Sequence, residues 1–134
     1  MARQLDEKVL VSGQIHPDEV AALVDEGITM LVNNRPDGEE LGQPLGVEIE
    51  EAARAVGLDY RAIPIIRGIG PADAEAMQEA IKSADGKLFA FCRTGTRSSL
   101  AWALAKSDEG MSRGEIEERL RSVGVDPMPI AHLL

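Results

Sequence analysis

Cysteine and histidine are scarce in this chain. Its 134 residues include one cysteine, Cys92, and two histidines, His16 and His132, which stand near opposite ends. A single cysteine excludes an internal disulfide, and no spacing of cysteine and histidine suits a zinc site. We therefore expect no metal and no cofactor, and we take the cytoplasm as the default compartment for a chain without disulfides. Any chemistry at Cys92 must come from its free thiol.

Positive charge is also in short supply. Lysine and arginine together number 14 against 23 aspartates and glutamates, which leaves a net charge of -9. A surface of this sign repels polyanions, because binding along a nucleic-acid backbone needs a basic face. We therefore exclude nucleic acid as a partner and expect any basic site to be local. Arg93 and Arg97, which both follow Cys92 within a few residues, form such a local site.

Long apolar runs are missing. None approaches the roughly 18 residues needed to span a bilayer, and residues 1–8 lack the apolar stretch of a signal peptide. We expect a soluble chain with no membrane partner. Only four aromatic residues are present besides histidine, so aliphatic side chains must fill most of the core. The length suits one domain, which we place at residues 1–134.

Extended and helical patterns alternate along the chain. The predicted strands are residues 8–11, 28–33, 60–66 and 87–91, and the predicted helices are residues 17–26, 47–56, 71–83, 98–106 and 113–122. This alternation predicts an α/β fold with a mostly parallel central sheet flanked by helices on both faces. Ligands of such sheets bind beyond the carboxyl ends of the strands, and Cys92 follows the last predicted strand directly.

Cys92 opens a polar loop between a strand and a helix. A loop of this kind gathers unpaired backbone N–H groups, and the helix dipole adds positive charge, so an anion binds there readily. The same field, with Arg93 and Arg97, favours the thiolate, and we expect Cys92 to be ionised and nucleophilic near neutral pH. The alternative is an inert, buried cysteine, which these polar and basic neighbours disfavour.

The remaining residues of the loop fit the same role. Gly95 lets the backbone turn inward without a clash of a Cβ atom. Thr94, Thr96 and Ser98 offer hydroxyl groups to an oxyanion or to the thiolate itself. We therefore predict that residues 92–98 bind the substrate as well as supply the nucleophile.

Two family resemblances follow from these motifs. The loop at residues 92–98 resembles the active-site loop of single-domain rhodaneses, which carry sulfane sulfur as a cysteine persulfide. Over residues 9–124, the chain resembles the phosphatase-like domain family found in beta-lactamase-hydrolase-like proteins. The motifs that carry this second resemblance are Val11-Ser12-Gly13-Gln14, Val32-Asn33-Asn34-Arg35-Pro36-Asp37-Gly38-Glu39, Tyr60-Arg61-Ala62-Ile63-Pro64 and the cysteine loop. It implies a dual-specificity-phosphatase-like fold.

The two resemblances imply different reactions. Cysteine phosphatases usually read His-Cys, five residues and then Arg, whereas here Phe91 precedes Cys92 and Arg97 follows after four residues. A shorter ring of N–H donors suits a group smaller than a phosphoryl group. Related phosphatases also place an aspartate just after the strand that corresponds to residues 60–65, and Ile66-Arg67-Gly68 stand there instead. The usual general acid is therefore missing.

Asp37 and Asp73 are the candidate substitutes for that acid. Asp37 should lie at the carboxyl end of the sheet beside Cys92, although Asp-Gly is also an ordinary turn pair. Asp73 lies in the first turn of a predicted helix, where acidic residues are favoured for electrostatic reasons alone. Arg35 and Arg67 could help to hold an anionic substrate, or they could be solvated surface residues.

We expect covalent catalysis through Cys92. Rhodanese-type sulfur transfer is narrowly favoured, because the leaving group departs as a stable anion and little use is made of a general acid. Phosphomonoester hydrolysis through a cysteinyl-phosphate is the alternative, and an anion-binding or oxidant-sensing module with an exposed thiol is a third interpretation. The expected substrate is a small anion, either phosphorylated or a sulfane-sulfur donor. A separate redox or hydrolase partner domain could work beside this one.

Overall fold

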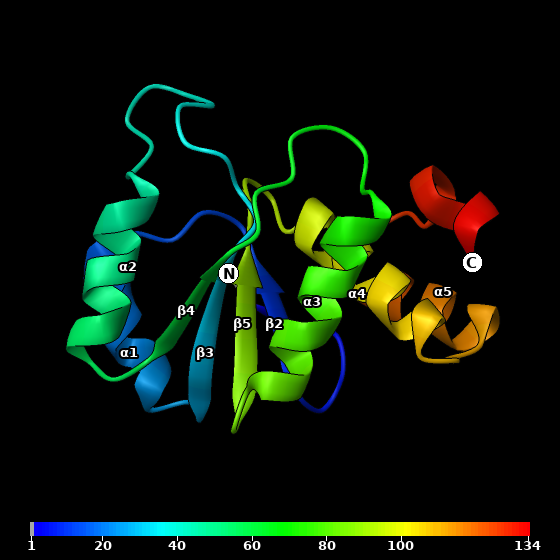
Figure 1. The fold of residues 1–134 in the computed structure, drawn as a ribbon, viewed down its shortest axis with the longest axis horizontal. Helices are drawn as coiled ribbons and strands as arrows, with labels where there is room; N and C mark the ends of the chain where they lie inside the picture. The colour runs from blue at the N-terminus through cyan, green and yellow to red at the C-terminus, as the bar shows by residue number, and fades with distance from the viewer. Residues whose placement is uncertain (1) are drawn as a thin grey trace.

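A five-stranded sheet runs through the centre of the computed structural model, which describes residues 2–134 (Figure 1). Its strand order is β1-β2-β5-β3-β4. The strands are β1 (Arg3–Gln4), β2 (Val9–Ser12), β3 (Ile28–Asn33), β4 (Asp59–Ala62) and β5 (Lys87–Phe91). Only β1 is antiparallel to its neighbour, and the other pairs are parallel. The predicted fold class is confirmed.

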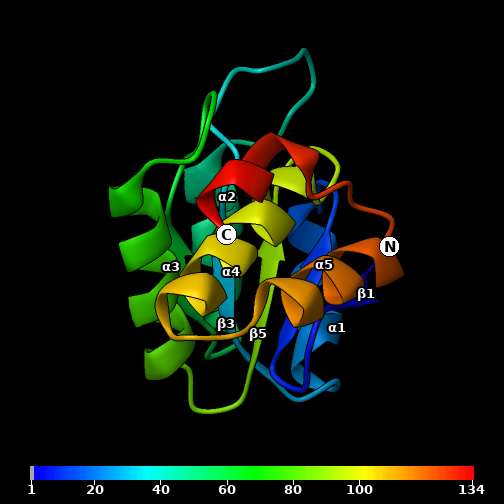
Figure 2. The same ribbon diagram turned by 90° about the vertical axis from the view of Figure 1, so that its right-hand side faces the viewer.

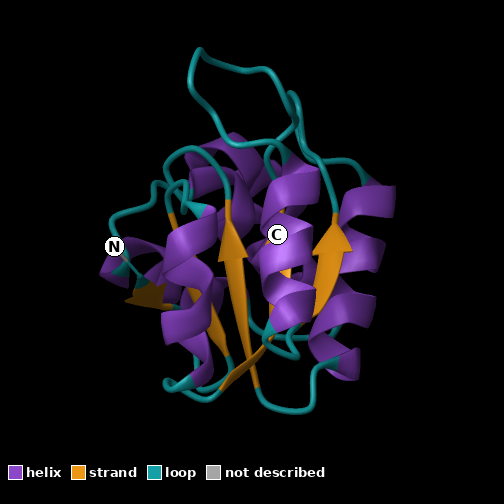
Figure 3. Ribbon diagram, turned by 90° about the vertical axis from the view of Figure 1, so that its left-hand side faces the viewer, coloured by secondary structure: helices purple, strands orange, loops and turns teal. Residues whose placement is uncertain are grey.

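Helices cover both faces of this sheet. On one face lie α1 (Val20–Val24), which follows a short 3₁₀ helix (Pro17–Glu19), and α2 (Gly46–Ala55). On the other face lie α3 (Pro71–Ser83), α4 (Thr96–Asp108) and α5 (Arg113–Ser122), followed by a second 3₁₀ helix (Met128–Leu133). Figure 2 shows the face with α3, α4 and α5, and Figure 3 shows the opposite side. Among the helices of the described residues, none has the length and apolar character of a bilayer span.

Most predicted boundaries agree with the structure, and the exceptions have local causes. The strand predicted at residues 60–66 ends at Ala62, because Pro64 has no N–H group with which to continue the ladder. The helix predicted at residues 17–26 is divided into a 3₁₀ turn and a short α-helix that ends at Val24. Strand β1 and the second 3₁₀ helix were not predicted, since neither has a periodic apolar pattern long enough to be recognised.

Strand β5 is packed on both faces. Leu88 and Ala90 belong to the core under α3, α4 and α5, whereas Phe89 and Phe91 belong to the core under α1 and α2. This alternation follows from the two-residue period of a strand. Because both faces are buried, the end of β5, and therefore the start of the loop at Cys92, is held rigidly.

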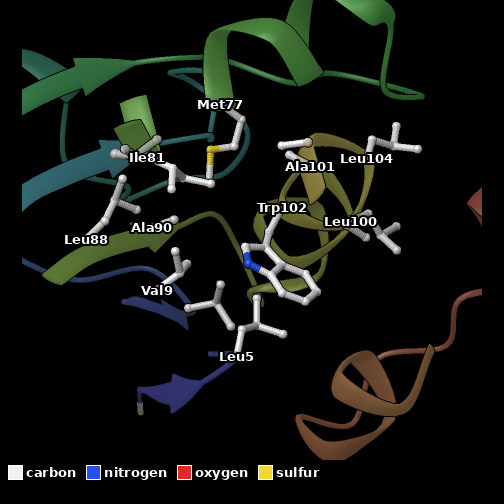
Figure 4. Close-up of a cluster of buried hydrophobic side chains, with 14 of the residues drawn as sticks. Leu5, Val9, Met77, Ile81, Leu88, Ala90, Leu100, Ala101, Trp102 and Leu104 are labelled. Carbon is white, nitrogen blue, oxygen red and sulfur yellow. The ribbon is translucent and has the colours of Figure 1, made fainter. Parts of the chain in front are cut away.

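Trp102 anchors α4 on the sheet. Its side chain is fully buried and packs in the cluster that also contains Leu5, Val9 and Leu100 (Figure 4). The indole N–H donates to Oδ2 of Asp6 at 2.9 Å, so the one polar group of the ring is satisfied. Trp102 thus packs α4 onto the sheet, and α4 is the helix whose first turn follows the cysteine loop.

Candidate active site

Cys92 lies at the carboxyl end of β5, between the ends of β2 and β3. The N–H of Cys92 donates to the carbonyl of Ser12 at 3.3 Å, and the N–H of Asn34 donates to the carbonyl of Phe91 at 2.8 Å. Both neighbouring strands therefore hold the point at which β5 becomes the loop. The loops at residues 34–45 and 63–70 rise above the same edge of the sheet (Figure 1). This is the edge at which parallel sheets bind their ligands.

The carbonyl groups of the cysteine loop are held by the body of the protein. The carbonyl of Arg93 accepts from the N–H of Gln14 at 3.3 Å. The carbonyl of Gly95 accepts from both the N–H and the hydroxyl of Ser99, at 3.0 and 2.8 Å. A Cβ atom on Gly13 would lie 2.9 Å from the Arg93 carbonyl oxygen, so a glycine is needed for this close approach. Hydrogen bonds to its carbonyl groups therefore hold the loop in place.

The donors of the loop consequently face the other way. In a planar trans peptide, the C=O and N–H groups point in opposite directions, and the described residues contain no cis peptide. The N–H groups of Thr94 and Thr96 therefore point away from the protein groups that hold the preceding carbonyls. The N–H of Gly95 donates to Sγ of Cys92 at 3.1 Å. The loop therefore aims a donor at the sulfur atom, where it can stabilise negative charge.

The three hydroxyl residues of the loop lie in different surroundings. Thr94 and Thr96 are exposed, and their hydroxyl groups are hydrogen-bonded to each other at 3.2 Å. Ser98 is buried and donates to Oδ1 of Asn34 at 2.7 Å. Asn34 in turn donates to the carbonyl of Ile63 at 3.0 Å. The structure thus places Ser98 in a buried link between α4, β3 and the segment after β4.

The thiol itself is buried. Cys92 has 0% of its surface exposed, so the exposed thiol of the oxidant-sensing interpretation is not found. The reason is that Cys92 still belongs to the wall of the sheet while the loop folds over its sulfur atom, with Gly95 directly above it.

Arg97 lies beside the thiol and is gripped by Glu39. Its two terminal nitrogens donate to the two oxygens of the Glu39 carboxylate, both at 2.8 Å, and Nη1 also donates to the carbonyl of Ile65 at 2.6 Å. The pKa of Arg97 is raised above its ordinary value, first by the hydrogen bonds to Glu39 and then by the charge of the Cys92 sulfur. Glu39 and the carbonyl of Ile65 therefore hold the guanidinium group in one orientation.

Arg35 is buried, so the interpretation of this residue as a solvated surface arginine is wrong. Only 3% of its surface is exposed. Each of its three nitrogens donates to a protein acceptor: Nε to Glu39 at 2.9 Å, Nη1 to Gln14 at 3.0 Å and Nη2 to Glu40 at 3.0 Å. These contacts arrange the loop that carries Glu39. Arg35 therefore acts on the site through Glu39 in this structure.

The other two arginines remain at the surface. The side chain of Arg93 is 64% exposed, and its Nε lies 4.0 Å from Oε1 of Glu40. Arg67 is exposed on the loop after β4. Arg93 is therefore free to meet an anion that approaches the loop from solvent, whereas a solvated surface position describes Arg67.

Glu39 is a residue of the site that sequence reasoning missed. Its carboxylate bridges Arg97 and Arg35, and these hydrogen bonds, the one from Arg97 first, lower the pKa of Glu39 to about 2 from an ordinary value of 4.5. The only signal in the sequence was an acidic residue in a turn-rich loop at the carboxyl end of a strand. That signal does not identify an arginine 58 residues away as the partner.

This bridge predicts a pH dependence of stability. The pKa of Glu39 is lower in the folded protein, so its ion pairs stabilise the fold above pH 4.5 and this stability is lost as the pH falls toward 2. We expect Glu39→Gln to lower the free energy of unfolding at pH 7 by about 1 kcal/mol, because solvent screens the pair. Denaturant unfolding at several pH values should show the difference narrowing below pH 4.5. Glu51→Gln, on an exposed position of α2, should show no such trend; a difference that is constant with pH would contradict the ionic bridge.

The side chains of both candidate acids accept a hydrogen bond from an N–H group at the start of a helix. Oδ1 of Asp37 accepts from the N–H of Gly46 at 2.8 Å, at the first residue of α2. Asp37 is also exposed and lines a cavity of about 250 Å³ together with Tyr60 and Val47. Oδ2 of Asp73 accepts from the N–H of Gly70 at 3.0 Å at the start of α3, which confirms its helix-start interpretation. Asp37 is thus the candidate that also lines a cavity, one to which buried Arg35 contributes as well.

The structure thus has a mostly parallel sheet, a cysteine directly after its central strand, an N–H group on the sulfur and an arginine in the next helical turn, an arrangement that fits the expected phosphatase-like fold. The chain shares this fold with PTPMT1 in complex with PI(5)P, at a TM-score of 0.74 and 13% identity over 96% of this chain and 89% of the other. The model of the family described as "Beta-lactamase hydrolase-like protein, phosphatase-like domain" matches residues 2–109. The chain belongs to this family.

Two further similarities concern sequence as well as fold. The beta-lactamase hydrolase-like protein of Xylella fastidiosa (strain Temecula1 / ATCC 700964) is 36% identical over 124 residues, which is 91% of this chain and 29% of that protein. A candidate phosphatase (nma1982) from Neisseria meningitidis z2491 is 32% identical in a solved structure, with a TM-score of 0.84 over 97% of this chain and 93% of the other. The chain thus spans less than a third of the Xylella relative.

Proposed function

We propose that the protein is a cysteine-dependent phosphomonoester hydrolase. The observation that carries this proposal is the bond of 3.1 Å from the Gly95 N–H to Sγ of Cys92, beneath a loop whose neighbouring donors face away from the protein. The thiolate would attack phosphorus, so that an S–P bond forms and the bond from phosphorus to the leaving oxygen breaks. Water would then attack the cysteinyl-phosphate, release inorganic phosphate and restore the thiolate.

The loop and Arg97 would bind the phosphoryl oxygens. Backbone N–H groups in a loop before a helix stabilise the charge that develops in the transition state. Arg97 would add a bidentate contact, with its orientation fixed by Glu39. Asp37 is the proposed proton donor to the leaving oxygen, because it lines the cavity at the ends of β3 and β4 where the organic part of the substrate could lie.

The similarities support phosphoryl chemistry over the sulfur transfer that the loop length favoured. The family and the Neisseria structure are both described in terms of phosphatases. The chain covers 29% of the Xylella relative. A partner hydrolase domain and the activity of that whole protein are therefore separate proposals.

Sulfur transfer is a second candidate, and one specific observation favours it. Four residues separate Cys92 from Arg97, and no carboxylate follows β4, where Ile66 and Arg67 stand. The thiolate would attack the sulfane sulfur of a donor such as thiosulfate, forming a persulfide and releasing sulfite. A thiophilic acceptor such as cyanide would remove that sulfur as thiocyanate and restore the thiolate.

A paired assay distinguishes the two reactions. Purified protein is given an aryl phosphate in one experiment and thiosulfate with cyanide in another, each with Cys92→Ser as the blank. We expect phosphate release that requires Cys92 and little or no thiocyanate. Asp37→Asn should slow phosphate release by about 10²-fold for a poor leaving group and much less for an activated aryl phosphate. Thiocyanate formation without phosphate release would replace the first proposal by the second.

A further inference from the structure

Arg3 reaches the cysteine loop from the edge of the sheet. It lies on β1, and its Nη2 donates to the carbonyl of Thr94 at 2.7 Å, although the two residues are 91 positions apart. Its Nη1 donates to the carbonyl of Val123 at 2.6 Å. The guanidinium group is planar with its donors in a fixed arrangement, so these two bonds determine where it lies. Arg3 thus joins the loop to a second, distant element.

That second element is a suitable anchor for a cation. Val123 is the C-terminal cap of α5, where the last carbonyl groups of the helix lack partners within the helix and carry partial negative charge. Val123 itself is buried, and α5 packs through Ile116 and Leu120 into the core. One side of the Arg3 guanidinium is therefore held by a rigid part of the fold, and the other side is presented to the loop.

The bond to Thr94 determines where the next donor points. The C=O of Thr94 and the N–H of Gly95 belong to one planar trans peptide and face in opposite directions. With the carbonyl turned toward Arg3, the N–H is turned toward Sγ of Cys92, which it reaches at 3.1 Å. Rotation of this peptide would remove the N–H from the sulfur and place a carbonyl dipole nearer to it.

Gly95 is required by the same arrangement. Its φ of +94° lies in the region that favours glycine. In addition, a Cβ atom at this position would collide with Nη2 of Arg3. The absence of a side chain at residue 95 therefore serves the approach of Arg3 as well as the turn of the backbone.

We propose that Arg3 is a positioning residue for the nucleophile. It holds the Thr94–Gly95 peptide in the orientation that directs an N–H group at Cys92, and thereby favours the thiolate. The inference rests on the proposed role of Cys92 as nucleophile, but it is independent of whether phosphorus or sulfur is attacked. A second effect follows, because the same peptide belongs to the ring of donors that would meet the substrate.

The test measures alkylation of Cys92 by iodoacetamide between pH 5 and pH 9. Arg3→Met keeps the apolar length of the side chain and removes its donors. We expect the rate at pH 7 to fall about 3- to 10-fold, the scale of one ordinary hydrogen bond, while the pH profile moves to higher pH. Arg3→Lys keeps the charge but has a single nitrogen in place of the two that reach the carbonyls of Val123 and Thr94, so it should recover only part of the rate.

Arg119→Met is the matched control. Arg119 donates to the carbonyl of Leu5 at 3.1 Å, so it joins α5 to the same N-terminal segment without a contact to the loop. Its alkylation profile should match that of the wild type, whatever change it makes to the unfolding midpoint. The positioning role is overturned if Arg3→Met leaves the profile unchanged, if Arg119→Met shifts it equally, or if Cys92 of the folded wild type does not react. If the wild type releases no phosphate while the alkylation results are as expected, only the proposed function is overturned.

Discussion

Cys92→Ser is expected to reduce phosphate release by roughly 10⁴-fold or more, the scale on which loss of a catalytic nucleophile is felt. A serine hydroxyl stays protonated at neutral pH and is a far weaker nucleophile than a thiolate. The fold should be unaffected, because serine fits the same buried site and its oxygen can accept the hydrogen bond from Gly95. Steady-state turnover of an aryl phosphate, with the unfolding midpoint measured in parallel, checks both parts.

The Cys92→Ser variant should still bind inorganic phosphate although its catalysis is lost. The N–H groups of residues 94–96 and the guanidinium group of Arg97 are unchanged by Cys92→Ser, so inorganic phosphate should still bind, as calorimetry can measure. Ser99→Ala is a useful comparison, because it removes a hydroxyl that holds the Gly95 carbonyl and leaves the nucleophile in place. Residual turnover of Cys92→Ser above a tenth of the wild-type rate would show that another residue attacks the substrate.

Arg97→Met is expected to lower kcat about 10²- to 10³-fold, the usual effect of removing a donor that stabilises developing negative charge. Two further losses accompany it, since Arg97 also donates to the carbonyl of Ile65 and pairs with Glu39. Arg97→Lys should retain most of the defect, because an ammonium group cannot make the bidentate contact. Turnover kinetics at saturating aryl phosphate measure the effect on kcat directly.

Arg93→Met is the neighbouring control. Arg93 is exposed, and its nearest acidic partner is 4.0 Å away, so its removal should change kcat less than about threefold and raise KM modestly. Equal losses of kcat at the two arginines would mean that net charge near the loop, rather than the fixed guanidinium of Arg97, supports the reaction. High salt should weaken the contribution of Arg93 and leave that of Arg97 largely intact.

Strands β3 and β5 have the bounds that their apolar runs predicted, and α3 begins at the proline and ends at the serine that marked it. These elements are defined by local signals: continuous burial, a proline at the first helical position and a turn pair. The pairing of β1 with β2 had no such signal. Two residues cannot show a period, and their partner is chosen by what remains uncovered once the rest of the sheet has formed.

The cysteine loop was likewise predictable, because its cysteine, its glycine and its first-turn arginine all lie within residues 92–97. Its supports were not. Glu39, which grips Arg97, and Arg3, which holds the Thr94 carbonyl, lie 58 and 91 residues away from their partners. The burial of Arg35 was not predictable either, because nothing in the neighbouring sequence distinguishes a buried, fully paired arginine from a solvated one.

By itself, the sequence determined that Cys92 directly follows a buried strand and begins the loop that leads into a helix, because the order of strand, loop and helix depends on neighbouring residues. Tertiary structure alone decided that the thiol is fully buried, that Glu39 and Ile65 orient Arg97, and that Arg3 turns a peptide toward the sulfur. The physical reason is that a hydrogen bond needs a suitable angle and a donor–acceptor distance set to within a few tenths of an ångström. Such precision arises only when segments distant in the chain are packed against one another.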